Sequence, residues 1–265
     1  ADENWIQDID FGGTFDNAIY GNNVTAFEIA DIYVDGSAGG VNGVYIYVDE
    51  SSDIANSPSL INGFDSSYIW YSQFTSLSNG VVFETFIYDG GSSEQHVRIL
   101  GNDFDEIGSD AIRVNAEITA GTYLYQDFTI GNNTVYSAGS NAVEIYNYSS
   151  YGADSYSYFS LFDNFAYGVG GAAFYVGGHA EYGGYVYQSV VGGDNDAIFS
   201  GYGFYIYAYA DDFGVVDQYL GLYDSFIYAS AYNGVYMGAR TNEYGVVYQT
   251  LLTEDFDVRY SGYNG

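Results

Sequence analysis

A short phrase recurs along this chain at a nearly constant interval. It consists of a small or polar residue, then Gly or Ala, then a run in which apolar residues alternate with Tyr. The phrase begins at Asn42, Asn79, Asp110, Asn141, Gly170, Tyr202 and Asn233, so the intervals are 37, 31, 31, 29, 32 and 31 residues. A fixed period near 31 is typical of stacked repeats. In such an array the equivalent residues of successive repeats lie next to one another, so each repeated residue type forms a column along the stack.

Each repeat contains two further phrases. One carries a Gln, at positions Gln126, Gln188, Gln218 and Gln249, within a second alternating run. A polar corner of Asn and Asp follows it, and then a third, short apolar–Tyr run such as TVYSAG or FIYASA. Each repeat therefore has three strand-like runs separated by turn residues.

The alternation within each run has period two, which is the period of a β-strand. Tyr, Val, Ile and Phe favour strands, and no segment has the periodicity and caps of a helix. Three strands in about 31 residues predict an all-β, single-domain parallel β-helix (β-solenoid), because propeller blades need four strands and a longer period. One buried column is expected to contain Val44, Val82, Ile112, Val143, Ala172, Phe204 and Val235.

The repeats divide the chain into two parts. Residues 42–265 carry the regular pattern and are predicted to form the solenoid. Residues 1–41 are less regular, and we expect an N-terminal cap or arm, although Asn17-Ala18-Ile19-Tyr20 resembles a degenerate coil start. The long first interval predicts a loop insertion around Asp53–Asn62, next to the single Pro58.

The charge of the chain excludes several partners. There are 35 acidic residues, four Arg, no Lys and a net charge of −31. Such a chain repels nucleic acid and anionic membranes. No apolar run reaches the roughly 20 residues that span a bilayer, so no membrane insertion is expected. Two interpretations of this charge are open. It is typical of a solvated surface adapted to high salt, or it indicates cations bound between stacked carboxylates.

The composition favours a secreted or cell-surface protein. It is rich in Tyr, Gly, Asp and Ser, and it contains no Lys and no Cys. Asn-X-Ser/Thr triplets at Asn23, Asn132 and Asn147 are compatible with secretion.

The repeat pattern over residues 42–265 resembles right-handed parallel β-helix proteins of the pectate-lyase-like type. That resemblance lies in phrases such as NGVYIYV and NAVEIYN, and not in an active-site motif. Many such proteins cleave acidic polysaccharides, the lyases with Ca²⁺ and an Arg or Lys base. Here Arg98 and Arg113 are expected to be ion-pair partners instead. Neither Asp211-Asp212 with His179 nor His96 completes a hydrolase constellation, so no catalytic residue is assigned.

Acidic clusters at three corners are candidate Ca²⁺ ligands, since carboxylate oxygens suit that ion. The residues are Asp103, Asp105, Asp194, Asp196, Asp255 and Asp257. No cofactor is required, and calcium is the one ion that the pattern suggests. Solvated turns are the alternative interpretation. A column of corner residues is expected at Asp103, Asn132, Asp163, Asp194, Asp224 and Asp255.

The 33 tyrosines carry the most functional information. On the first strand of the repeat, Tyr45, Tyr205 and Tyr236 are predicted to share one outward column, and Tyr47, Tyr146 and Tyr207 the next. One exposed Tyr per coil merely suits a half-buried strand. Two adjacent columns predict a flat aromatic face that contacts a partner, either another protein chain or a cell-surface glycan.

The ends of the repeat array suggest self-assembly. The chain stops at Asn264-Gly265, which matches the start of a further unit. An apolar N-terminal arm with Trp5, Ile6, Ile9 and Phe11 could add a strand to that open edge, and such a head-to-tail contact yields a filament.

These features predict a structural, non-catalytic extracellular protein that forms a fibre, sheath or surface layer from copies of itself. The alternatives are a polysaccharide lyase or hydrolase with this fold, and a glycan-binding adhesin. Release of unsaturated uronides from pectin or alginate would identify the lyase.

Overall fold

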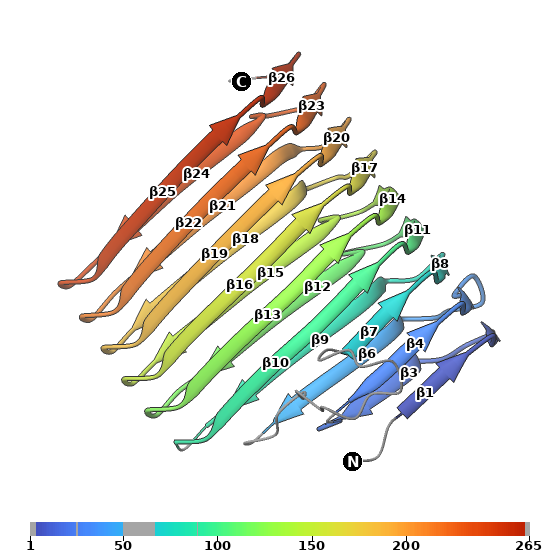
Figure 1. Cartoon of the computed structure of the whole chain (residues 1–265), viewed down its shortest axis with the longest axis horizontal. Helices are drawn as coiled ribbons and strands as arrows, with labels where there is room; N and C mark the ends of the chain where they lie inside the picture. The colour runs from blue at the N-terminus through green and yellow to red at the C-terminus, as the bar shows by residue number, and fades with distance from the viewer. Residues whose placement is uncertain (1–3, 25, 50–66, 89, 263–265) are drawn as a thin grey trace.

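The computed structural model describes residues 4–24, 26–49, 67–88 and 90–262. In these residues the chain winds into a solenoid of three parallel sheets, and each coil contributes one strand to each sheet (Figure 1). The strands lie in chain order from the blue end to the red end of the molecule. No helix occurs among the described residues, and none of them forms a segment that could cross a membrane as a helix. The expected Asp53–Asn62 insertion and Asn264-Gly265 lie outside the described residues.

The Gln-containing phrase forms sheet A. Its strands are β1 (Asn4–Gln7), β4 (Phe27–Ala30), β7 (Ser67–Trp70), β10 (Ser92–Leu100), β13 (Tyr123–Gly131), β16 (Asp154–Phe162), β19 (Tyr185–Gly193), β22 (Val215–Tyr223) and β25 (Val246–Glu254).

The short third run forms sheet B. Its strands are β2 (Asp10–Gly12), β5 (Tyr33–Asp35), β8 (Gln73–Thr75), β11 (Asp103–Ile107), β14 (Thr134–Ala138), β17 (Phe165–Tyr167), β20 (Asp196–Ile198), β23 (Phe226–Tyr228) and β26 (Asp257–Arg259).

The phrase that begins each repeat forms sheet C. Its strands are β3 (Asn17–Asn22), β6 (Asn42–Asp49), β9 (Asn79–Ile87), β12 (Ile112–Ile118), β15 (Val143–Ser150), β18 (Ala172–Glu181), β21 (Tyr202–Ala210) and β24 (Val235–Thr241). The predicted all-β solenoid with three strands per coil is therefore confirmed.

The expected boundary at residue 42 does not coincide with a change of architecture. β1 pairs with β4, β2 with β5, and β3 with β6. Trp5 and Ile6 belong to β1, Phe11 belongs to β2, and Ile9 lies between these strands. Ile6 and Phe11 pack against the main core. The segment therefore forms the first coil and part of the second, and the expectation of a separate arm is corrected on this point.

The interior of the solenoid is filled by columns of apolar side chains. In sheet C one such column is Val44, Val81, Ile112, Val143, Phe174, Phe204 and Val235. Two members differ from the prediction. Val82 lies in the outer column beside Tyr45, one residue after Val81, although it is only 1% exposed. The repeat phrase begins at Ala172 and not at Gly170, so that Phe174 takes the position expected for Ala172.

Two ladders of buried amides cross the coils inside these sheets. At the corner after sheet A, each of Asn102, Asn133 and Asn164 donates from Nδ2 to the Oδ1 of the next Asn, ending at Asn195, over 2.9–3.1 Å. A second column contains the Gln residues of the repeat, and Gln126, Gln218 and Gln249 each donate to the Gln one coil away. The recurrent Gln therefore points into the solenoid, where its hydrogen bonds hold neighbouring coils in register. Asn147 also lies inside, so its triplet is unavailable to a glycan.

Candidate functional site

The outer face of sheet C contains both predicted tyrosine columns. Tyr45, Tyr205 and Tyr236 do share one column, and Tyr47, Tyr146 and Tyr207 share the next, all of them half-buried. Neither column is continuous. The first is interrupted by Val82, Arg113 and Glu144, and the second by Glu84, Asn115 and Gly177. The expected flat aromatic face is therefore a set of tyrosine clusters separated by polar and small residues.

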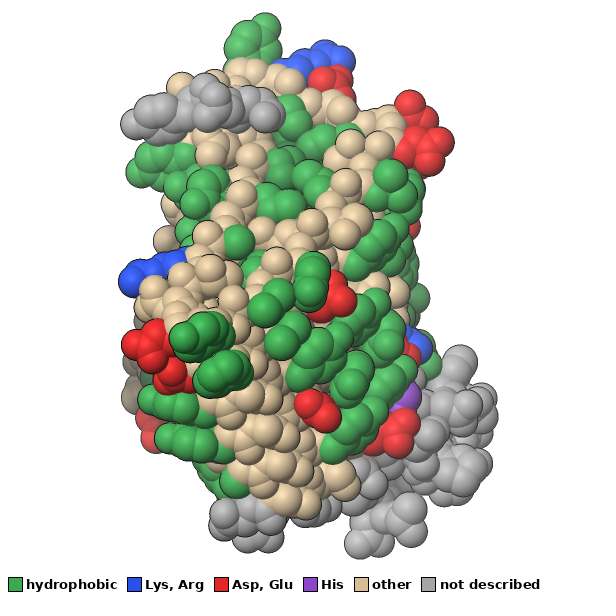
Figure 2. All heavy atoms as spheres, turned by 90° about the vertical axis from the view of Figure 1, so that its left-hand side faces the viewer, with side chains coloured by type: hydrophobic (Ala, Val, Ile, Leu, Met, Phe, Trp, Pro, Cys, Tyr) green, Lys and Arg blue, Asp and Glu red, His purple; other side chains and the backbone are tan. Residues whose placement is uncertain are grey.

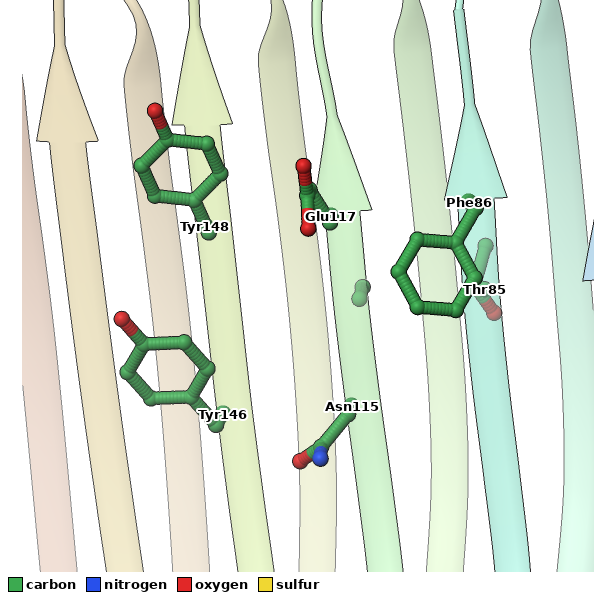
Figure 3. A pocket seen from close by; sticks show the side chains of 7 residues that line it. Thr85, Phe86, Asn115, Glu117, Tyr146 and Tyr148 are labelled. Carbon is green, nitrogen blue, oxygen red and sulfur yellow. The ribbon is translucent and has the colours of Figure 1, made fainter.

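One interruption forms a groove of about 390 Å³ (Figure 3). Phe86 of β9 borders it on one side, and Tyr146 and Tyr148 of β15 border it on the other. Asn115 and Glu117 of β12 lie between these rings. The β-strand period alone sets this pattern, because residues two apart on one strand point to the same face.

A second depression of about 270 Å³ lies further along the same face and shares Tyr146 with the first. Its floor contains Gly178, and it is lined by His179, Tyr207, Tyr209 and Arg240 among others. The neighbouring Gly177 lies between Tyr146 and Tyr207 in their column, where a larger side chain would meet the ring of Tyr146. The absence of a side chain there keeps this part of the face open.

Hydrogen bonds fix several side chains of the groove and of this second depression. The Tyr146 hydroxyl lies 3.4 Å from His179 Nδ1, and the Tyr148 hydroxyl donates to Glu181. The Tyr209 hydroxyl donates to Asp211 over 2.8 Å and accepts from Asn242. The His179 ring lies 4.6 Å from the Tyr209 ring, centroid to centroid. These contacts hold the side chains in place without a bound ligand.

Burial controls the protonation of this face. Desolvation lowers the pKa of His179, although the charges of Glu181 and Asp211 oppose that effect, so the ring is neutral at pH 7. Burial also raises the pKa of the Tyr146 and Tyr148 hydroxyls, which stay protonated. The pKa of Glu144 is raised by burial and then by the charge of Asp110. The face therefore offers neutral hydrogen-bonding groups around a few carboxylates.

Arg98 and Arg113 are ion-pair partners, as the sequence predicts. Arg98 lies 3.4 Å from Asp127 on sheet A. Arg113 lies 3.1 Å from Asp110 and 3.7 Å from Glu84 on sheet C. Both are thereby engaged with carboxylates.

A larger tyrosine cluster lies on the outer face of sheet A, where no site was predicted. Its six rings belong to Tyr123, Tyr125, Tyr156, Tyr158, Tyr185 and Tyr187. Neighbouring centroids lie 5.5–5.6 Å apart in the Tyr123–Tyr156, Tyr125–Tyr158, Tyr156–Tyr185 and Tyr158–Tyr187 pairs. Figure 2 shows hydrophobic side chains, a class that includes Tyr, gathered in patches on one side of the molecule. The signal was present in the sequence, as the alternating Tyr of TYLYQ, SYSYF and GYVYQ. We call these six residues the sheet A tyrosine cluster.

The predicted calcium ligands are dispersed. Asp103, Asp196 and Asp257 share one column of sheet B, but Thr134 and Phe165 lie between the first two and Phe226 between the last two. Asp105 lies in a neighbouring column beside Tyr136. Among the described residues no group of three or more His, Asp or Glu side chains is arranged to hold a metal ion. Calcium therefore stays a prediction that rests on the corner column alone.

That corner column differs from the expectation in one member. Asn132, Asp163, Asp194, Asp224 and Asp255 all have left-handed backbone, with φ between 46° and 54°, and the corresponding residue one coil earlier is Gly101 and not Asp103. Asn, Asp and Gly tolerate this conformation best. Asp194 and Asp255 thus lie at the corner with Asp163 and Asp224, which places four exposed carboxylates on four successive coils.

We expect cations to stabilise this corner. Carboxylates one strand spacing apart, about 4.8 Å, repel by ~0.9 kcal/mol per pair even in bulk water. Millimolar Ca²⁺ at low salt should therefore raise the melting temperature relative to chelator, and NaCl should raise it by screening. The double variant Asp194→Asn/Asp224→Asn keeps the turn chemistry and should respond less. Equal melting temperatures in chelator, Ca²⁺ and NaCl would rule out the repulsion.

Comparisons with known proteins assign no family to this chain. No family model matches the chain, and no curated protein matches it. Among solved structures, the A-module of the mannuronan C-5 epimerase AlgE4 from Azotobacter vinelandii is similar over 97% of this chain and 80% of its own, with 12% identity and a TM-score of 0.33. The pairing of the chain's own strands establishes the parallel β-solenoid.

Proposed function

We propose that this protein is a non-catalytic extracellular structural solenoid, and that copies of it make lateral contacts through the sheet A tyrosine cluster. The observation that carries the proposal is the continuity of that cluster over three successive coils. Tyr rings provide large contact area at low entropic cost and keep a polar hydroxyl for pairing. Burial raises the pKa of Tyr185 to about 12, with the charge of Asp217 second, so its hydroxyl stays neutral.

The rigid backbone supports this role. The cluster is borne on β13, β16 and β19, which pair along nine residues each without interruption. Side chains held on such a surface lose little freedom on binding, so contact between two faces is less costly than contact between loops. Self-repulsion at a net charge of −31 acts against association. Lateral contact should therefore require salt, which screens exposed charges beyond ~10 Å at 0.1 M.

We expect association of the purified protein to increase with NaCl and to depend on this cluster. Sedimentation velocity at low and high salt would measure it. The double variant Tyr156→Ser/Tyr187→Ser removes central rings and should stay monomeric at both salt concentrations. The matched control Tyr33→Ser/Tyr136→Ser removes two exposed rings of sheet B and should associate like the parent. Association of the cluster variant at parental levels would refute the lateral contact.

Head-to-tail growth remains a separate proposal. It would place β25 of one copy beside β1 of the next, without an arm, since Trp5 and Ile6 are already paired with β4. Negative-stain microscopy separates the two modes of assembly. Head-to-tail contact gives single threads that survive in the Tyr156→Ser/Tyr187→Ser variant, whereas lateral contact gives bundles or sheets that disappear in it.

A further inference from the structure

We propose that the outer face of sheet C binds an uncharged, hydroxyl-rich sugar chain, along a path from the Asn115 groove to the His179 depression. This site is separate from the sheet A tyrosine cluster and does not depend on lateral association. Four observations on the described residues lead to it: the shape of the path, two buried polar atoms without partners, the mixture of rings with neutral polar groups, and the charge of the surroundings.

The first observation is the shape of the path. The groove is lined from β9, β12 and β15, and the depression is lined from β15, β18, β21 and β24. Tyr146 lines both, so the two form one path that crosses the strands along the solenoid axis. Six strands at a spacing of about 4.8 Å make this path too long for a single small molecule. Its length suits several units of a polymer.

The second observation is that two polar atoms of this path lack hydrogen bonds. Asn115 Oδ1 and His179 Nε2 are buried, and neither has a partner among the described residues. The nearest carboxylate oxygen to His179 Nε2 belongs to Glu181, at 3.8 Å, which is too long for a hydrogen bond. Leaving such atoms unpaired is costly, so a ligand that pairs them gains binding energy.

The identity of these two atoms indicates the ligand group. Asn115 Oδ1 is an acceptor. If the Tyr146 hydroxyl donates to His179 Nδ1, the neutral ring carries its proton on Nε2 and is a donor there. One path therefore needs both a donor and an acceptor from its ligand. A hydroxyl group supplies both functions, whereas a carboxylate or an ammonium supplies one.

The third observation is the arrangement of rings beside these polar atoms. Phe86, Tyr146 and Tyr148 border the groove while Asn115 and Glu117 lie between them (Figure 3). Sugar rings have apolar faces and polar edges, and they pair with aromatic faces and with hydrogen-bonding side chains at the same time. A peptide strand would need a free sheet edge, and this path lies on the face of paired strands.

The fourth observation is the charge around the path, which decides between sugar classes. Glu117 lies in the groove, and Glu181 and Asp211 lie beside the depression. The one arginine of the path, Arg240, lies over the ring of Tyr209 at 5.5 Å. The whole chain adds a net charge of −31. Uronate or sulfate groups would be repelled here, so an uncharged chain is favoured.

The test is a titration of the full-length protein by isothermal calorimetry at fixed salt. The probes are neutral hexasaccharides of β-linked glucose, mannose and xylose, with hexagalacturonate and a mannuronate hexamer as acidic counterparts. We expect at least one neutral probe to bind and neither acidic probe to do so. No heat from any neutral probe would overturn the proposal, and preferential binding of an acidic probe would overturn the assigned sugar class.

Variants place the binding on this path. Asn115→Ala and His179→Ala each remove one of the unpartnered atoms and should weaken binding by about tenfold. Tyr146→Phe keeps the ring but removes the hydroxyl that orients His179, and it serves if either Ala variant fails to fold by circular dichroism. Tyr156→Ser on sheet A is the matched control and should bind like the parent. Unchanged affinity in the folded groove variants would refute the site.

The same samples test for chemistry. Mass spectrometry of the probe after incubation should return it intact, as expected for a binding site without catalysis. Recovery of shortened or unsaturated sugars would show that the face is an active site, and the proposal of a binding site alone would then be wrong.

Discussion

Replacing Val143 with Asp is expected to unfold the protein at temperatures where the parent is stable. Val143 is 2% exposed and lies between Ile112 and Phe174 in the interior column of sheet C. An ionised carboxylate there has no hydrogen-bond partner in the apolar column, and burying it costs several kcal/mol. The carboxyl either stays neutral with a raised pKa or forces water into the coil. Thermal unfolding followed by far-ultraviolet circular dichroism would measure the loss.

A matched control separates burial from charge. Val191 is on the outer face of sheet A and is 43% exposed. Val191→Asp makes the same substitution and adds the same charge to the chain, but leaves the interior unchanged. It should melt within a few degrees of the parent. If the two variants melted alike, the assignment of Val143 to the interior column would be wrong.

Replacing Asn164 with Ala is expected to cost about 2–5 kcal/mol, because four buried groups each lose a hydrogen bond to its side chain. Asn164 Oδ1 accepts from the backbone N–H of Asn133 at 3.2 Å and from Asn133 Nδ2 at 3.1 Å. Its Nδ2 donates to the carbonyl of Ile130 and to Asn195 Oδ1, both over 2.9 Å. Alanine supplies none of these bonds and leaves a small cavity. Chemical denaturation would give the change in the free energy of unfolding.

The control for this variant is Asn22→Ala. Asn22 lies on the outer face of β3 and is exposed, so its replacement should change the free energy of unfolding by less than about 0.5 kcal/mol. Asn164→Asp is informative in addition, because it keeps the acceptor of the ladder and loses the donor. An Asn164→Ala variant as stable as Asn22→Ala would show that the ladder contributes nothing.

The sequence was sufficient to predict the architecture because each coil repeats the same physical pattern. Period-two alternation defines the strands, and Asn, Asp and Gly define the corners. Errors arose where one coil departs from the others. Ala172 occupies a position that Asn141 holds one coil earlier, so the sequence pattern places the start of this phrase two residues too early, at Gly170. In the coil of Asp103 the corner residue is Gly101, two positions earlier, and an acidic corner pattern does not identify a Gly.

The candidate sites were less predictable, for two physical reasons. The sequence predicts which tyrosines share a column on sheet C, but the groove and the depression form only where Asn115 and Gly177 interrupt the column that contains Tyr146. Such gaps depend on the register of three or more coils, and a single repeat does not reveal them. The sequence likewise does not show whether the recurrent Gln faces the interior or the solvent. A Gln side chain can hydrogen-bond to water on the outer face or to another amide inside, and packing between coils decides between them.

The regular pairing of strands also determines how this chain can fold. Each strand pairs with the strand one coil away, so from β7 onward the chain segments closed by pairing have nearly the same short length, about 31 residues in a chain of 265. The cost of closing such a segment is modest and does not grow as coils are added. Folding can therefore begin at any coil and spread to both sides, as in other repeat arrays. A weakened central coil, such as that of Val143, would then divide one cooperative unit into two that unfold separately.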